Sequence, residues 1–198
     1  TSTLQQEAAR KLRFSAKNTM RVAQKLYENG FITYMRTDST HLSDEAVEGS
    51  RHIVSDLFGD DFLPKSPNNY ETNVKNAQEA HEAIRPAHKI FKSIDTVSKK
   101  LGKDAGNLYD LIWKRTIASQ MLPAKLKQTS VIISNADTDF RASGQTIVFP
   151  GYMKIYVEGK DNPEAELANK EKILPEMSEN EILMLSLIHI SEPTRHCL

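Results

Sequence analysis

The chain has 198 residues, of which 39% are hydrophobic and 26% charged, a composition typical of a globular protein with room for one core and part of a second domain. It contains no apolar run near the ~20 residues of a membrane-spanning helix, no signal-peptide pattern at its N-terminus and a single cysteine, Cys197, which excludes a disulfide framework and a cysteine-based zinc site. With only one cysteine and no signal-peptide pattern, we expect a protein of the reducing cytoplasm. The formal net charge of zero does not by itself indicate a nucleic-acid partner.

The N-terminal segment is predicted to form two helices followed by a strand. Ser2 or Thr3 is suited to cap the first helix, and Ser15 the second. The second helix is expected to stop at residues 29–30, where Asn-Gly favours a left-handed turn. Residues 31–35 are rich in β-branched and aromatic side chains, which is typical of a short strand. Two helices joined by a tight turn and followed by a strand indicate the beginning of a winged helix-turn-helix.

The middle of the chain is predicted to be mainly helical. Ser43 is suited to cap a third helix that runs to residue 58. A polar loop over residues 63–74 and a short helical turn over 78–84 follow. Residues 105–121 show the apolar spacing of a further helix.

The pattern then changes to that of a β meander, with strands over residues 129–134, 138–142 and 145–149. The fold class predicted is therefore α+β: a mainly α-helical, winged helix-turn-helix-like domain over residues 1–122, followed over 123–185 by part of an antiparallel β hinge domain. Residues 186–198 continue no pattern and are interpreted as a non-native tail.

Charge is unevenly distributed along the chain. Before Asp38 the sequence has only two acidic residues but seven basic ones: Arg10, Lys11, Arg13, Lys17, Arg21, Lys25 and Arg36. This asymmetry indicates an anion-binding face in the N-terminal part, although charge alone favours the alternative of an ordinary solvated helix surface.

The densest group of polar side chains lies in residues 32–39, where a strand would place Tyr34, Arg36 and Asp38 on one face. A phenol with its usual pKa of ~10 is a poor nucleophile until it loses its proton. An arginine beside it can pair with a phosphate and stabilise the charge that develops during phosphoryl transfer. The spacing alone nevertheless favours a core tyrosine on an amphipathic strand with a surface arginine.

Two longer motifs change this balance. Residues 32–39, ITYMRTDS, match the active-site motif of the type IA DNA topoisomerases, and residues 78–86, QEAHEAIRP, resemble a second motif of bacterial members of that family. Residues 1–8 resemble the segment that opens the family's tyrosine domain. Shorter similarities follow in family order at residues 111–113, 121–125, 149–152 and 174–175.

The resemblance implies a role for each residue of these motifs. Tyr34 attacks a phosphodiester of single-stranded DNA and becomes joined to the 5′ phosphate, while Arg36 holds that phosphate. His81 lies close by and positions or polarises the phosphate; a structural histidine is the alternative. Arg85 either orients its loop or touches DNA. Asp38 either orients Arg36 or, as its residue type favours, caps a turn.

The resemblance also implies what surrounds the chain. With Arg36, the basic Lys17 and Arg21 are expected to contact DNA, on the ground of the charge asymmetry noted above. The partner is single-stranded or negatively supercoiled DNA, no membrane is involved, and the protein is a monomer of the bacterial cytoplasm. Mg²⁺ is bound by an acidic Toprim domain upstream of this segment, so we expect no metal site in this chain and no activity from it alone.

Two alternatives remain open at this point. A non-catalytic winged-helix module would read duplex DNA with the helix that begins near Lys17. A helical interaction domain would show no salt-dependent binding to DNA at all. Within the family, the motifs resemble the relaxing type more than the decatenating type.

Overall fold

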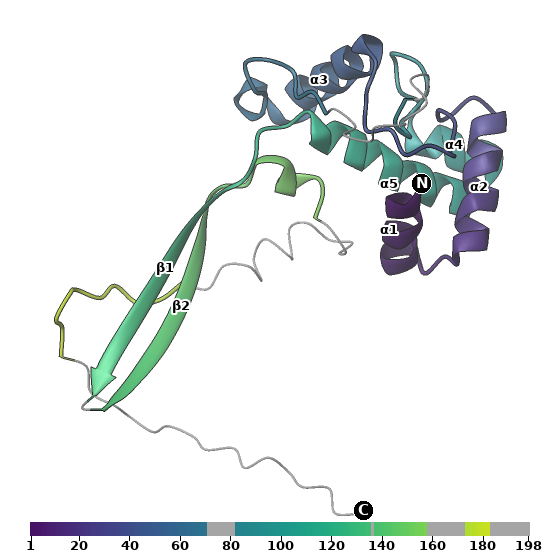
Figure 1. Cartoon of the computed structure of the whole chain (residues 1–198). Coiled ribbons are helices and arrows are strands. Elements are labelled where there is room, and N and C mark those ends of the chain that lie inside the picture. Colours follow the sequence, from purple (N-terminus) through teal and green to yellow (C-terminus); the bar gives the residue numbers. More distant parts are fainter. Residues whose placement is uncertain (71–81, 136, 158–172, 183–198) are drawn as a thin grey trace, which may run out of the picture.

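The computed structural model describes residues 1–70, 82–135, 137–157 and 173–182. It confirms the α+β class: a helical body carries a long two-stranded antiparallel hairpin that extends away from it (Figure 1). In chain order the elements are α1 (Ser2–Leu12), α2 (Ala16–Glu28), α3 (Asp44–Phe58), the 3-10 helix η1 (Asp60–Phe62), α4 (Ile94–Leu101), α5 (Lys103–Ser119), β1 (Lys125–Asn135), β2 (Thr138–Phe149) and the 3-10 helix η2 (Gly151–Lys154).

A tight turn joins α1 to α2, as the sequence predicts. Arg13 takes a left-handed conformation with φ of 58° and ends α1, and the Ser15 hydroxyl accepts a hydrogen bond from the N–H of Asn18 at the start of α2. The cap predicted for α1 at Ser2 or Thr3 is wrong, since the N-cap is Thr1, whose hydroxyl bonds to a distant segment instead.

The predicted strand over residues 31–35 is also wrong. This segment is a loop with one isolated bridge, between Ile32 and Pro86. A proline has no N–H to donate, so a longer ladder cannot form along this partner. The strand that a winged helix-turn-helix would need at this position is therefore missing, although the two helices before it are present.

Helix α5 is the centre of the core, and the four other α-helices of the described chain pack against it or against its neighbours. Its Tyr109 is fully buried and meets the ring of Phe31 edge-on, with ring centroids 6.3 Å apart. Burial raises the pKa of Tyr109 to about 12, although its hydroxyl donates a hydrogen bond to the Lys92 carbonyl at 3.0 Å. The helix predicted over 105–121 is thus present, shifted by two residues.

Helix α4 was missed by the sequence analysis. Ser93 accepts a hydrogen bond from the N–H of Thr96, and the apolar residues Ile94, Val97 and Leu101 follow at helical spacing, so the signal was present over a short stretch. The short helical turn predicted over 78–84 is not formed at residues 82–84, and its remaining residues lie outside the described part of the chain.

The β region consists of two long strands rather than a three-stranded meander. Strands β1 and β2 pair from Lys125 opposite Phe149 to Asn135 opposite Thr138. The predicted turn at residues 143–144 is wrong because Gly144 continues β2 opposite Thr129. A glycine inside a strand is tolerated where the ladder runs through it without interruption.

A buried polar cluster ties α1 to the chain that returns from the hairpin. The carboxylate of Glu7, 3% exposed, accepts a hydrogen bond from the Tyr156 hydroxyl at 2.6 Å and lies 3.6 Å from the Lys11 ammonium. Lys11 also donates to the Val157 carbonyl at 2.7 Å and lies over the Tyr156 ring, 4.0 Å from its centroid. Burial, followed by the hydrogen bond to Glu7, raises the pKa of Tyr156 well above its ordinary value, so this phenol stays protonated as the donor.

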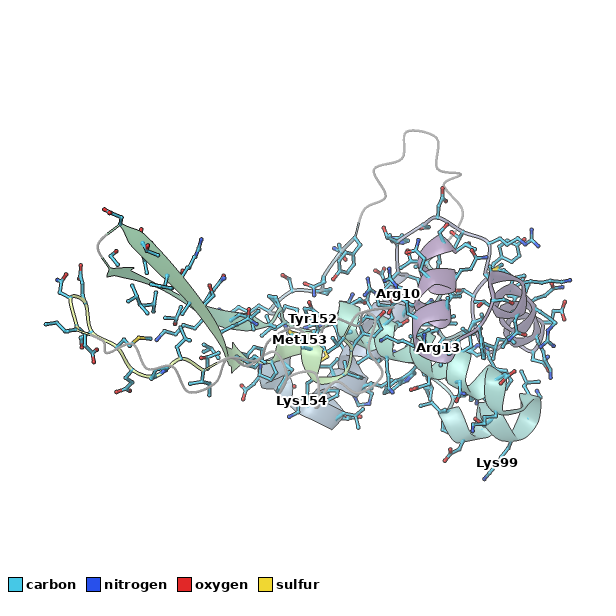
Figure 2. The ribbon with its side chains drawn as sticks, turned by 90° about the horizontal axis from the view of Figure 1, so that it is seen from below. Arg10, Arg13, Lys99, Tyr152, Met153 and Lys154 are labelled. Carbon is cyan, nitrogen blue, oxygen red and sulfur yellow. The ribbon has the colours of Figure 1, made fainter. Side chains whose placement is uncertain are left out.

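The cluster generates a stability prediction. Replacing Tyr156 by Phe removes the donor to a buried carboxylate and is expected to lower the free energy of unfolding by about 1–3 kcal/mol. Equilibrium urea unfolding of the chain measures the change, and Tyr152→Phe is the matched control because Tyr152 is 39% exposed on η2 (Figure 2). Equal losses in the two variants would contradict the assigned role of the cluster.

The difference in unfolding free energy between wild type and Tyr156→Phe is expected to depend on pH. Because the folded pKa of Tyr156 is raised, the contribution of its hydroxyl is complete below the unfolded pKa of about 10 and is lost as pH rises above it. The difference in unfolding free energy between wild type and Tyr156→Phe should therefore be constant at neutral pH and narrow above pH ~10.

Candidate active site

Side chains of the 32–39 motif alternate between solvent and core even though the segment is not a strand. Tyr34 is 39% exposed and Arg36 and Asp38 are exposed, whereas Met35 and Thr37 are buried. The loop thus presents the three polar side chains to solvent. The strand interpretation had placed them on one face, but the core tyrosine that spacing alone favours is not found, since Tyr34 lies at the surface. Within the described chain the Arg36 guanidinium forms no ion pair or hydrogen bond, so its donors are available to an anion.

The backbone just before Tyr34 is held by residues about fifty positions later in the chain. The N–H of Thr33 donates to the Arg85 carbonyl at 3.0 Å, and the Thr33 hydroxyl accepts from the Arg85 N–H at 2.9 Å. The same hydroxyl donates to the Ala83 carbonyl at 2.7 Å. One further backbone bond, from Ala87 to the Phe31 carbonyl at 2.8 Å, closes the junction. We call these contacts the Thr33–Arg85 junction.

Arg85 itself is turned into the protein. It is 6% exposed, and its guanidinium donates to the Glu82 carboxylate at 2.8 and 3.2 Å, to the Ser43 hydroxyl at 3.1 Å and to the Pro86 carbonyl at 2.9 Å. Ser43 is the N-cap residue of α3, and its N–H donates to Glu82 at 2.9 Å. The guanidinium therefore joins the junction to the start of α3 and has no exposed edge directed at solvent.

The Glu82 carboxylate that pairs with Arg85 stays ionised at neutral pH. Partial burial acts to raise its pKa, but hydrogen bonds from Ser43 and the charge and hydrogen bonds of Arg85 outweigh this and lower the pKa. The ion pair is thus a permanent part of the fold under ordinary conditions.

The backbone just after Tyr34 is held by Thr1, the first residue of the sequence. The Thr1 hydroxyl accepts from the Thr37 N–H at 2.9 Å and lies 2.9 Å from the Met35 carbonyl. The turn that follows is closed by the hydroxyls of Thr37 and Ser39, which accept from the N–H groups of Ser39 and His41. Within the described chain Asp38 forms no ion pair with Arg36, and its charge acts on the Thr1 ammonium; the roles expected for it stay predictions.

A second aromatic side chain, missed by the sequence analysis, lies against Tyr34. Tyr27, in the last turn of α2, meets the Tyr34 ring with centroids 5.3 Å apart and planes inclined at 69°. It is 43% exposed, so it belongs to the surface of the site and not to the core. The available signal was its seven-residue separation from Tyr34 across the predicted Asn29-Gly30 turn.

The predicted DNA-binding residues of α2 lie on its surface. Lys17 and Arg21 are exposed, and Arg21 receives support from Asn18 through a hydrogen bond of 2.7 Å. Arg21 and Lys25 also line, together with Lys103 of α5, a pocket of about 230 Å³. Lys17, Arg21 and Lys25 therefore form an exposed basic stripe along α2.

One motif residue, His81, cannot be placed relative to Tyr34. His81 lies outside the described residues, so its expected position beside Tyr34 stays a prediction.

The chain contains one Asp-x-Asp run, Asp137 and Asp139, which is exposed at the tip of the hairpin. Over the described ranges no three His, Cys, Asp or Glu side chains gather into a set that could hold a metal ion. Nor does any helix in those ranges have the length and apolarity to cross a membrane.

The sequence of the chain is similar to those of known DNA topoisomerases. The model of the DNA topoisomerase family matches residues 1–194. DNA topoisomerase 1 of Synechocystis sp. is 56% identical over 175 residues, which cover 88% of this chain and 19% of the relative. DNA topoisomerase 1 of Streptomyces coelicolor is 55% identical over 188 residues, covering 92% and 20% respectively.

The fold of the chain is also similar to that of a solved topoisomerase structure. Full-length topoisomerase I from Thermotoga maritima superposes with a TM-score of 0.72 at 37% identity, over 91% of this chain and 28% of that one. The chain thus spans about one fifth of the length of the curated relatives it matches.

The Thr33–Arg85 junction can be tested by a nearly isosteric substitution. Thr33→Val removes the hydroxyl that both accepts from the Arg85 N–H and donates to Ala83, and should lower the free energy of unfolding by about 1–3 kcal/mol. Thr33→Ser keeps the hydroxyl and is the control. Urea unfolding of the three proteins measures the difference, and a valine variant as stable as the serine variant would show that the hydroxyl bonds contribute little.

Proposed function

The chain belongs to the DNA topoisomerase family, and on that premise we propose that it carries the tyrosine, Tyr34, with which a type IA enzyme of bacteria cuts and rejoins single-stranded DNA. The observation that carries the proposal is the exposure of Tyr34 and Arg36 on a loop whose backbone is held on both sides. A nucleophile held in a fixed place reacts faster because less orientational freedom is lost on the way to the transition state.

The proposed reaction is a transesterification. The Tyr34 oxygen attacks a phosphorus atom of the DNA backbone, a new O–P bond forms, and the bond from that phosphorus to the 3′ oxygen breaks. The phenol loses its proton and the leaving 3′ oxygen gains one. The DNA is then joined through its 5′ phosphate to Tyr34, and attack by the 3′ hydroxyl reverses the step after another strand has passed. The number of phosphoester bonds is unchanged, so no ATP is consumed.

Arg36 is proposed to bind the scissile phosphate. A guanidinium donates two parallel hydrogen bonds to a phosphate and stabilises the negative charge that increases in the transition state. Its exposure and its lack of a partner in the described chain support this role, because no competing ion pair has to be broken first.

The other motif residues are given supporting roles. Arg85 is proposed to position the loop, since its guanidinium is satisfied by protein groups. His81 is proposed to lie near the phosphate, and the hydrogen bond between Ala83, two residues further on, and Thr33 supports this. Mg²⁺ is proposed to be held by a Toprim domain of the complete enzyme, as membership of the family implies. On this proposal the chain alone is inactive, the whole protein relaxes negative supercoils as a monomer, and its place is at the bacterial nucleoid.

A winged-helix DNA-binding module is the second candidate. The observation in its favour is the tight α1–α2 turn with Lys17 and Arg21 exposed on the second helix. This candidate makes no use of Tyr34, which provides the test that separates the two.

Residues 1–185 placed in the complete Streptomyces coelicolor enzyme, in exchange for its matching segment, should relax negatively supercoiled plasmid in the presence of magnesium and trap a covalent 5′ adduct. Tyr34→Phe should lose both activities, because phenylalanine has no nucleophilic oxygen. Tyr152→Phe is the matched control and should keep them. If the Tyr34→Phe chimera still forms the adduct, Tyr34 is not the nucleophile and the binding-module candidate takes its place.

The contribution of α2 to DNA binding has a distinct signature. Each phosphate contact to single-stranded DNA adds about 0.7 to the slope of log K against log salt concentration. Lys17→Ala and Arg21→Ala, each made in the chimera, should reduce that slope by about this amount with an oligonucleotide in fluorescence anisotropy. Lys65→Ala, in an exposed loop after η1, is the control and should leave the slope unchanged. Unchanged slopes in both α2 variants would remove these residues from the DNA-binding surface.

A further inference from the structure

We propose that Tyr27 is a positioning residue for Tyr34: its ring holds the ring of the nucleophile in the orientation from which it attacks DNA. The inference rests on the proposed function of Tyr34. The observation behind it is the edge-to-face contact between the two rings, with centroids 5.3 Å apart and planes at 69°. Pairs of this geometry are attractive because the positive edge of one ring meets the negative face of the other.

The backbone of Tyr27 is fixed at the end of α2. It lies in the last turn of α2, next to Leu26, which is fully buried. The N–H groups of Gly30 and Phe31 donate to the carbonyls of Tyr27 and Leu26, both at 2.9 Å, and close the helix end tightly. Gly30 has a φ of 71°, which a residue with a side chain rarely adopts, so the turn that faces the two rings toward each other depends on glycine.

The orientation of the Tyr34 ring also matters for the attack, because the phenol oxygen lies at the far end of the side chain. The backbone is held before the residue by the Thr33–Arg85 junction and after it by Thr1. These backbone contacts fix the position of the Cα atom, whereas contacts of the ring itself select its rotamer. A ring packed against one side of Tyr34 favours a subset of its rotamers.

The exposure of Tyr27 separates this role from an ordinary structural one. A tyrosine needed for the core would be buried, whereas Tyr27 is 43% exposed and contributes its contact at the surface of the site. Its removal is therefore expected to change the behaviour of Tyr34 while the helical body stays folded. A competing role for an exposed ring beside a DNA-cutting residue is stacking on a base, which would change DNA affinity instead.

The test uses the chimera described above with Tyr27→Leu, Tyr27→Phe and the control Tyr152→Leu. Single-turnover cleavage of a saturating oligonucleotide should slow by about threefold to tenfold in Tyr27→Leu, the change that an aromatic pair of this geometry supplies. Tyr27→Phe keeps the ring and should cleave within about twofold of wild type. Affinity for the oligonucleotide, measured in a Tyr34→Phe background that cannot cleave, should be unchanged in all variants.

A second readout does not depend on cleavage. With 3-fluorotyrosine at position 34, the fluorine resonance should move toward that of the free amino acid in Tyr27→Leu and stay in place in Tyr27→Phe and Tyr152→Leu. An unchanged resonance in Tyr27→Leu, or a cleavage rate equal to wild type, overturns the inference. A loss of affinity without a change in the saturated rate also overturns it, in favour of base stacking. Adduct formation by the Tyr34→Phe chimera overturns the proposed function itself and is recognised independently.

Discussion

The geometry of the site depends on one hydroxyl group. Thr33 has a single side-chain oxygen, and it both accepts from the Arg85 N–H and donates to the Ala83 carbonyl. The surrounding backbone groups are thereby satisfied without a β ladder, which Pro86 would interrupt. The loop can therefore remain irregular, expose Tyr34 and still be held in one conformation. The buried Arg85 guanidinium extends the same constraint to the N-cap residue of α3.

The sequence analysis predicted features that depend on neighbouring residues and was wrong where the deciding contacts come from residues far away in the sequence. The starts of helices at Ser15 and Ser43 and the helix end at residue 58 were predicted at the right positions, because residues that favour helix ends act within a few positions. The Ser43 hydroxyl nevertheless makes no capping bond and accepts from Arg85 instead. The loop around Tyr34 was predicted as a strand because β-branched and aromatic residues favour that conformation locally, while its actual partners lie some fifty residues away. The prediction that Tyr34, Arg36 and Asp38 share one face still agrees with their alternation with buried residues, since an extended loop alternates its side chains much as a strand does. The exposure of Tyr34 itself was not predicted, because spacing alone favoured a core tyrosine.

Other parts of the site required the structure. A local pattern can identify Arg85 as a motif residue but cannot reveal whether its guanidinium points inward, because that depends on Glu82 and Ser43. The contact between Tyr27 and Tyr34 depends on how the Gly30 turn directs the chain, which composition does not specify. The turn predicted at residues 143–144 failed for the opposite reason: a locally favourable turn sequence was overridden by continuous pairing with β1.

The buried cluster of Glu7 and Tyr156 has a consequence for the order in which the protein is made. The two residues lie 149 positions apart, so α1 leaves the ribosome long before its partner exists. At roughly 5–20 residues per second this delay is on the order of 7–30 s. During that time Glu7 and Lys11 remain hydrated, and α1 lacks the contact that joins it to the end of the hairpin. The first helix of the chain is therefore among the last to reach its final environment during synthesis.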